Sequence, residues 1–171
     1  LRSRGLGDVY KRQVDEQVGR LLDYLEEKGV LDNTVIVYTS DQGFLLGEHG
    51  LYDKRFMYEE SFRTPLIISC PSLVKKHSVC KELVQNIDLA PTFLSLAGVE
   101  VPKEMSGRSL LPLFKNGKAE NWRNELYYHF YDYPAVGSVR KHDGIRTKRY
   151  KLIHWYGAVS YTHLRAHETG A

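Results

Sequence analysis

The most informative stretch for the fold is Thr34-Val35-Ile36-Val37-Tyr38-Thr39, a nearly continuous run of apolar and β-branched residues. Such a run is typical of a strand buried inside a parallel sheet. Before it, the apolar residues at 14, 18, 21, 22 and 25 recur at helical spacing, and Gly29 is placed to end that helix in a left-handed conformation. A helix, a short turn and a buried strand are half of a βαβ unit, so the sequence predicts an α/β fold.

The remaining segments complete this prediction. Residues 65–69 read as another buried strand, and residues 87–98 as a helix with Pro91 in its first turn and Gly98 at its end. After residues 107–114 the sequence becomes aromatic, and residues 125–131 and 144–155 predict strands of a small antiparallel sheet. We therefore expect a parallel-sheet α/β region over residues 14–115 and a small antiparallel subdomain, accompanied by a helix, over residues 116–157.

The two ends of the chain differ from its interior. Residues 1–13 and 158–171 show neither helical nor strand periodicity and resemble translated adapter sequence, so we expect non-native tails there. A metal pair formed by His163 and His167 is correspondingly disfavoured. The net charge is +3, and residues 1–13 alone carry four basic residues against one acidic residue, which leaves the interior neutral. This distribution argues against a nucleic-acid partner, which would select a basic folded face.

Other broad features exclude little. No apolar run approaches the roughly 20 residues that cross a bilayer, so no membrane segment is expected. The two cysteines, Cys70 and Cys80, could be bridged or free, and two thiols do not define a redox compartment. The oligomeric state is open.

A loop rich in glycine and charge follows the first strand, over residues 40–63. Ligand sites of α/β sheets lie at the carboxyl ends of strands, where Asp41 and Gln42 are placed. A carboxylate and an amide oxygen suit Ca²⁺ or Mg²⁺, whereas a zinc site would favour His or Cys. The alternative is a polar turn in which Asp41 caps backbone N–H groups.

Several ordered motifs resemble the sulfatase family of the alkaline phosphatase superfamily. They are TSDQGFLLGEHG at 39–50, DKRFMYEES at 53–61 and RTPL at 63–66, then NIDLAPT at 86–92, GRSL at 107–110 and IRTKRYKLI at 145–153. The resemblance covers residues 14–157 and is nearest to carbohydrate sulfatases, such as enzymes acting on N-acetylglucosamine 6-sulfate. It implies a sulfatase-type fold and hydrolysis of sulfuric esters, with a sulfated sugar or glycosaminoglycan fragment as partner.

The resemblance also implies roles for residues of the loop. Asp41 and Gln42 would be two of the ligands of a calcium ion, with Mg²⁺ a weaker alternative. Lys54 would hold a sulfate oxygen and offset charge as the S–O bond breaks. His49 could donate a proton to the leaving alcohol, or it could be a structural histidine that holds the loop.

A second set of residues is suited to binding an anionic sugar. Arg63 could neutralise the substrate or pair with Glu59 or Glu60. In the C-terminal part, aromatic and basic side chains could stack on sugar rings and bind acidic groups, although each could equally belong to a satisfied sheet surface; the candidates are His129, Tyr131, Arg140, His142 and Arg146.

The chain lacks the nucleophile of the family. Sulfatases use a formylglycine made from the Cys or Ser of a Cys/Ser-x-Pro/Ala-x-Arg motif, near two further aspartate ligands. Cys70 is followed directly by proline, and the fifth position of that stretch holds Val74 instead of arginine, so we expect a structural cysteine. The formylglycine is expected in a preceding part of the protein. This segment alone should be inactive, fold poorly and bind calcium weakly.

Two other functions remain open. One is a metal-dependent phosphohydrolase of the same superfamily, and the other is a non-catalytic carbohydrate-binding module that uses the C-terminal aromatic residues. Family members are usually periplasmic, secreted or lysosomal, which the resemblance implies for the compartment.

Overall fold

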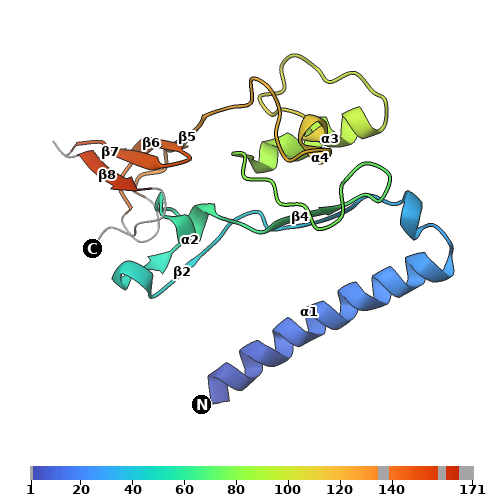
Figure 1. The fold of residues 1–171 in the computed structure, drawn as a ribbon. Coiled ribbons are helices and arrows are strands. Elements are labelled where there is room, and N and C mark those ends of the chain that lie inside the picture. The colour runs from blue at the N-terminus through green and yellow to red at the C-terminus, as the bar shows by residue number, and fades with distance from the viewer. Residues whose placement is uncertain (1, 135–138, 158–160, 166–171) are drawn as a thin grey trace. The chain divides into compact units, whose positions relative to one another are not determined.

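The computed structural model describes the backbone of residues 2–134, 139–157 and 161–165 (Figure 1). The chain divides into two units, one formed by Leu1–Ile36 with Ile68–Val74 and the other by Val37–Ile67 with Lys75–Ala171. The candidate site lies in the second unit.

The first unit is dominated by helix α1, Arg2–Glu27, which a short 3₁₀ turn, Leu31–Asn33, follows. The predicted helix end is confirmed: Gly29 has a φ of +65°, and the Val30 N–H donates to the Leu25 carbonyl at 3.0 Å. The helix begins well before residue 14, so most of the predicted N-terminal tail is helical. An existing helix extends at little cost and needs no apolar stripe, which is why periodicity did not reveal this extension.

Strands β1, Ile36–Thr39, and β4, Leu66–Ser69, form a two-stranded sheet, and the Thr39 hydroxyl donates to the Pro65 carbonyl at 2.9 Å. Both predicted strands are therefore confirmed. Their predicted burial is incomplete, because Tyr38 is 48% exposed and Ile67 is 62% exposed.

The segment between β1 and β4 contains short elements. Strands β2, Leu45–Leu46, and β3, Tyr52–Asp53, pair antiparallel around a 3₁₀ turn, Glu48–Gly50. Helix α2, Glu59–Phe62, follows. Leu45 and Met57 are fully buried and anchor this segment to its surroundings.

The predicted helix over residues 87–98 is confirmed as a 3₁₀ turn η3, Asn86–Asp88, continued by α3, Leu89–Leu96. Pro91 is buried in its first turn, and Gly98 ends it with a φ of +70°. A further short helix, α4, Leu111–Phe114, contacts α3 and buries Leu113 and Phe114.

The predicted antiparallel sheet is confirmed with four strands in the order β5-β6-β7-β8. Their bounds are Glu125–Phe130, His142–Thr147, Tyr150–Trp155 and Tyr161–Arg165. The single strand expected over residues 144–155 is two strands, because the Thr147 hydroxyl accepts the N–H groups of Arg149 and Tyr150 and makes a turn. Strand β8 lies in the predicted C-terminal tail; the rest of that tail, including His167, lies outside the described residues.

The sheet has two different faces. The Tyr128 and His142 rings lie on the inner face, and a Cβ added to Gly144 on this face would lie 2.5 Å from the Met57 sulfur. Helix α2 lies on this side, tied by Arg146 to Glu59. On the outer face, Tyr127 and His129 lie near Asp143. The inner face thus fixes the position of the segment that carries the site.

Candidate functional site

The loop after β1 is held against α2 by its glycine. The Gly43 N–H donates to the Ser61 carbonyl at 3.0 Å, and a Cβ at this position would meet the Glu60 carbonyl oxygen at 1.8 Å. No side chain fits at that distance, so Gly43 lets the loop approach α2 closely. The Ser40 hydroxyl donates to the Gln42 carbonyl at 3.0 Å and tightens the turn.

The side-chain amide nitrogen of Gln42 donates two hydrogen bonds. Nε2 donates to the Lys54 carbonyl at 2.9 Å and to the Ser61 carbonyl at 3.0 Å. A primary amide has two N–H donors, so both are satisfied and the side chain is fixed with Oε1 as its remaining polar atom. Within the described residues no hydrogen bond reaches Oε1. The amide therefore presents an oxygen of the type that Ca²⁺ and Mg²⁺ bind.

Asp41 lies next to this amide with an exposed side chain. In the part of the chain that the structure describes, its carboxylate makes no hydrogen bond or ion pair. The alternative of a turn capped by Asp41 would require such bonds. A residue distant in sequence holds the backbone of this turn. Asn86 Nδ2 donates to the Asp41 carbonyl at 2.8 Å and approaches the Ser40 carbonyl at 3.4 Å.

Asp41 and Gln42 provide two oxygen donors, which fit a hard cation but do not complete its shell. Calcium takes about six to eight oxygen ligands. No group of three or more His, Cys, Asp or Glu side chains that could hold a metal occurs among the described residues. The donors fit calcium by their chemistry, and the remaining ligands would have to come from elsewhere.

Lys54 is fixed by its backbone and free at its ammonium group. Asp53 Oδ1 accepts the Lys54 N–H at 2.6 Å and the Arg55 N–H at 2.7 Å, while the Lys54 carbonyl accepts from Gln42. The ammonium makes no ion pair within the described residues, and the side chain is exposed. The lysine can therefore bind an anion without giving up an existing partner.

His49 is held in an unusual backbone conformation. His49 lies in the turn between Gly47 and Gly50 and has a φ of +55°. Its ring stacks on the Tyr58 ring, with 4.6 Å between the centroids. Nε2 lies 3.3 Å from Glu60 Oε1, and the His49 side chain is only 12% exposed. These contacts fit one of the two alternatives for His49, a histidine that holds the loop. They leave Nδ1 as the ring nitrogen that could exchange a proton with a ligand.

Arg63 does not pair with the carboxylates proposed for it. Its N–H donates to the Glu59 carbonyl at 2.7 Å, but the Glu59 carboxylate is bound by Lys151 at 2.9 Å and by Arg146 at 3.2 Å. Burial raises the pKa of Glu59, but hydrogen bonds from the two cations outweigh it, and the net pKa is lowered. Among the described residues the Arg63 side chain has no ion pair, and it is exposed.

The C-terminal sugar-binding candidates are divided between the two faces of the sheet. His142 is fully buried, where its Nδ1 lies 2.8 Å from the Arg140 carbonyl and burial lowers its pKa. Arg146 is committed to Glu59 on the same inner face. These two residues therefore have structural partners, whereas Tyr131 and Arg140 are exposed and His129 is partly exposed. The rings of His129 and Tyr131 lie 3.7 Å apart between centroids, tilted by 33°.

Sequence reasoning assigned no role to several residues that shape the site. Asn86 opens a motif that resembles the family, but its contact with Asp41 spans 45 positions of sequence. Asp88 and Arg123 form a buried ion pair at 2.6 Å, and Lys151 reaches Glu59 from β7. Among these residues, only Lys151 could have been found from the sequence. It is a charged residue at an inward-facing position of a strand, and such a residue needs a partner of opposite charge.

Comparison with known proteins assigns the class. Residues 47–168 match the family model described as "N-sulphoglucosamine sulphohydrolase, C-terminal". Because this match covers well over half of the chain, the chain belongs to this sulfatase family. The described residues contain no helix long and apolar enough to cross a membrane.

The chain is similar to individual sulfatases over most of its length. It is 58% identical over 148 residues to the N-acetylglucosamine-6-O-sulfatase of Bacteroides thetaiotaomicron, an alignment that covers 85% of this chain and 26% of that protein. The structure of BT4656 in complex with its substrate D-glucosamine-2-N,6-O-disulfate matches with a TM-score of 0.84 and 54% identity, over 89% of this chain and 31% of that one. These matches confirm the predicted fold class.

A phosphonate monoester hydrolase from Silicibacter pomeroyi also matches, with a TM-score of 0.78, 29% identity and coverage of 89% of this chain and 32% of that one. The chain thus spans about a quarter to a third of the length of the relatives it matches.

Proposed function

We propose that this segment supplies part of the active site of a carbohydrate sulfatase that hydrolyses sulfate esters of glucosamine-type sugars. The observation that carries the proposal is the double hydrogen bond of Gln42 Nε2 to the Lys54 and Ser61 carbonyls. It leaves Oε1 as the remaining polar atom of the Gln42 side chain, and it ties Gln42 to the backbone of Lys54. Asp41, the preceding residue, adds a carboxylate that has no partner among the described residues. The substrates named for the B. thetaiotaomicron sulfatase and for the BT4656 complex support this choice of substrate.

Asp41 and Gln42 would hold calcium, with Mg²⁺ a weaker alternative, together with ligands from outside this chain. Bound there, the cation would neutralise charge on the sulfate oxygens. A formylglycine nucleophile is expected in another part of the protein. Lys54 binds a sulfate oxygen with its unpaired ammonium and stabilises the charge that develops as the S–O bond breaks.

His49 is proposed as the proton donor to the leaving alcohol. Its ring is fixed by Tyr58 and by Glu60, so Nδ1 keeps a constant direction. Arg63, His129 and Arg140 are proposed to contact the sugar or its anionic groups, because Arg63 and Arg140 are exposed and His129 is partly exposed. His142 and Arg146 would act indirectly, through the packing of β6 on α2.

The likeness to a phosphonate monoester hydrolase favours a second candidate, hydrolysis of phosphonate or phosphate esters at the same cation site. A cation with a lysine would stabilise either tetrahedral anion. The chain is 29% identical to that enzyme and 58% identical to the sulfatase, and we therefore favour sulfate ester hydrolysis over phosphonate ester hydrolysis.

Substrate comparison tests the proposal. The protein at its full natural length would be assayed with N-acetylglucosamine 6-sulfate and with a phenyl phosphonate monoester, with calcium and after calcium removal by EGTA. The proposal expects calcium-dependent sulfate release with a kcat/KM well above that for the phosphonate ester. Preferential cleavage of the phosphonate ester would replace it with the second candidate, and sulfate release unaffected by EGTA would refute the metal assignment.

A further inference from the structure

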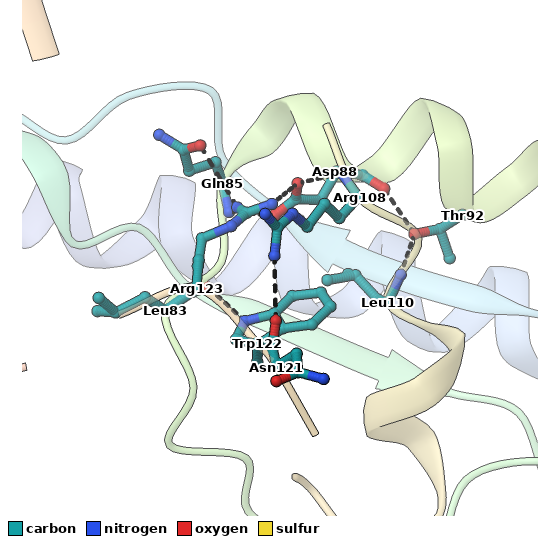
Figure 2. A network of polar contacts seen from close by, with 9 residues as sticks. All are labelled: Leu83, Gln85, Asp88, Thr92, Arg108, Leu110, Asn121, Trp122 and Arg123. Carbon is teal, nitrogen blue, oxygen red and sulfur yellow. Dashed lines mark hydrogen bonds and ion pairs between the residues drawn. The ribbon is translucent and has the colours of Figure 1, made fainter. Parts of the chain in front are cut away.

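A buried ion pair lies next to the candidate site. Arg123 Nη1 and Nη2 donate to the two Asp88 carboxylate oxygens at 2.6 and 2.7 Å, and the Asp88 side chain is completely buried (Figure 2). A bidentate pair of this kind fixes both distance and orientation. Arg123 also stacks over the Trp122 ring at 5.2 Å, and the Trp122 indole N–H donates to the Leu83 carbonyl at 2.8 Å.

The same carboxylate organises the backbone around η3. Asp88 Oδ2 accepts the Gln85 N–H at 2.8 Å, and the Asp88 N–H donates to the Gln85 carbonyl at 2.9 Å, so the turn over residues 85–88 is closed at both ends. Asp88 Oδ1 accepts the Arg108 N–H at 2.8 Å. Gly107 permits this approach, because a Cβ there would meet the Ile87 carbonyl at 1.9 Å.

Asn86 lies inside this closed turn and is the residue that reaches the cation loop. Its Nδ2 donates to the Asp41 carbonyl at 2.8 Å and approaches the Ser40 carbonyl at 3.4 Å. The contact is made to the backbone that carries the candidate ligands Asp41 and Gln42. The Asn86 side chain is exposed, so it contributes little to the core.

We propose that Asn86 is a positioning residue for the cation loop: its side-chain amide fixes the backbone of Ser40 and Asp41, and the buried Asp88–Arg123 pair holds Asn86 in register. This inference rests on the proposed function, because it takes Asp41 and Gln42 as cation ligands. Residues that orient metal ligands without touching the metal typically change its affinity by about 10- to 100-fold when they are altered.

The test measures calcium binding rather than activity. The protein at its full natural length, stripped with EGTA, would be titrated with CaCl₂ by calorimetry as wild type, Asp41→Asn, Asn86→Ala and Asn86→Asp. Asn116→Ala is the matched control, since it removes an exposed asparagine amide elsewhere. Hydrogen exchange of the amides of residues 40–46 in the metal-free protein provides the second readout.

Asn86→Ala should weaken calcium binding about tenfold, while its melting temperature without calcium stays close to that of wild type. Asn86→Asp should weaken binding at least as much, because its carboxylate would face two carbonyl oxygens. Both should speed exchange over residues 40–46, and Asn116→Ala should change neither quantity.

The outcomes distinguish the positioning role of Asn86 from the cation site itself. If Asp41→Asn abolishes calcium binding while both Asn86 variants keep wild-type affinity and exchange, the positioning role is wrong and the proposed cation site stands. If Asp41→Asn binds calcium as wild type does, the proposed cation site is wrong, and the positioning role is refuted with it.

Discussion

The side-chain amide of Gln42 donates to the backbone carbonyl of Lys54 at 2.9 Å, which couples a candidate cation ligand directly to a candidate sulfate-binding residue. The two residues are 12 positions apart, and the intervening chain forms the β2–β3 hairpin with His49 at its tip. A substitution at Gln42 should therefore change both the binding of the cation and the position of Lys54.

Replacing Gln42 by Glu should weaken calcium binding although it adds a negative charge. The substitution removes the donors to the Lys54 and Ser61 carbonyls and places a carboxylate oxygen against two acceptors. Calorimetric titration with CaCl₂ checks this, and Asp41→Asn serves as the comparison that removes charge alone. Tighter binding in Gln42→Glu would show that its amide nitrogen has no orienting role.

Gly43→Ala should destabilise the protein by ~1–3 kcal/mol, because the added Cβ would overlap the Glu60 carbonyl oxygen and push the loop away from α2. Gly19→Ala is the matched control. A Cβ at Gly19 meets nothing within 4 Å, and alanine in a helix is favoured by ~1 kcal/mol over glycine. Urea unfolding measures both, and equal stability of the two variants would contradict the close approach.

The cluster formed by Glu59, Arg146 and Lys151 predicts that the free energy of unfolding depends on pH. The pKa of Glu59 is lowered in the folded state, since its hydrogen bonds to Arg146 and Lys151 outweigh the opposing effect of burial. Its contribution is therefore present above the ordinary value of 4.5 and is lost as the pH falls through the lower folded value. Urea midpoints between pH 7 and pH 3 should fall less steeply in Glu59→Gln than in wild type.

Removing the Glu59 carboxylate should lower the free energy of unfolding more than removing one of its two cations does. Glu59→Gln leaves the buried Lys151 ammonium and the Arg146 guanidinium without a carboxylate, and an uncompensated buried charge costs roughly 3 kcal/mol. Lys151→Met keeps Glu59 paired with Arg146 and should cost less. Lys103→Met, at an exposed position, is the control. Urea unfolding at pH 7 measures the variants, and a loss in Glu59→Gln no larger than that in Lys151→Met would contradict this order.

His142 predicts a second pH effect, at higher pH. Burial lowers its pKa below the ordinary value of 6.5, so the unfolded chain takes up a proton first. The stability that this histidine contributes is thus complete above pH 6.5 and declines as the pH falls from there toward the folded value. Denaturant midpoints of wild type and His142→Phe should converge on acidification across this range, and a constant difference would contradict it.

The local parts of the fold could be predicted from the sequence, and the long-range contacts could not. The apolar run over residues 34–39 and Gly29 located β1 and the end of α1, because both signals are local. The turn at Thr147 was missed because its hydroxyl closes it without Gly or Pro. The pairing of Glu59 with Arg146 joins positions 87 apart, which no periodicity encodes.

The candidate residues of the site could be selected from the sequence to a similar extent, and their roles stay predictions. Asp41, Gln42 and Lys54 stand out by their place after a strand and by motif, whereas the orientation of the Gln42 amide depends on the Ser61 carbonyl in a separate helix. His142 was a candidate for sugar binding by residue type. His142, Gly144 and Arg146 alternate along β6 and therefore share one face of the sheet. The sequence does not show which of the two faces is the inner one, so it could not place His142 there.

The central claim is that Asp41 and Lys54 act in one sulfate-hydrolysing site, and the direct measurement is kcat for sulfate release from N-acetylglucosamine 6-sulfate. It would be made on the protein at its full natural length as wild type, Asp41→Asn, Lys54→Ala and Lys103→Ala, with calcium present. We predict that Asp41→Asn and Lys54→Ala each lower kcat about 100-fold or more while Lys103→Ala matches wild type. Wild-type turnover in either Asp41→Asn or Lys54→Ala would contradict the claim.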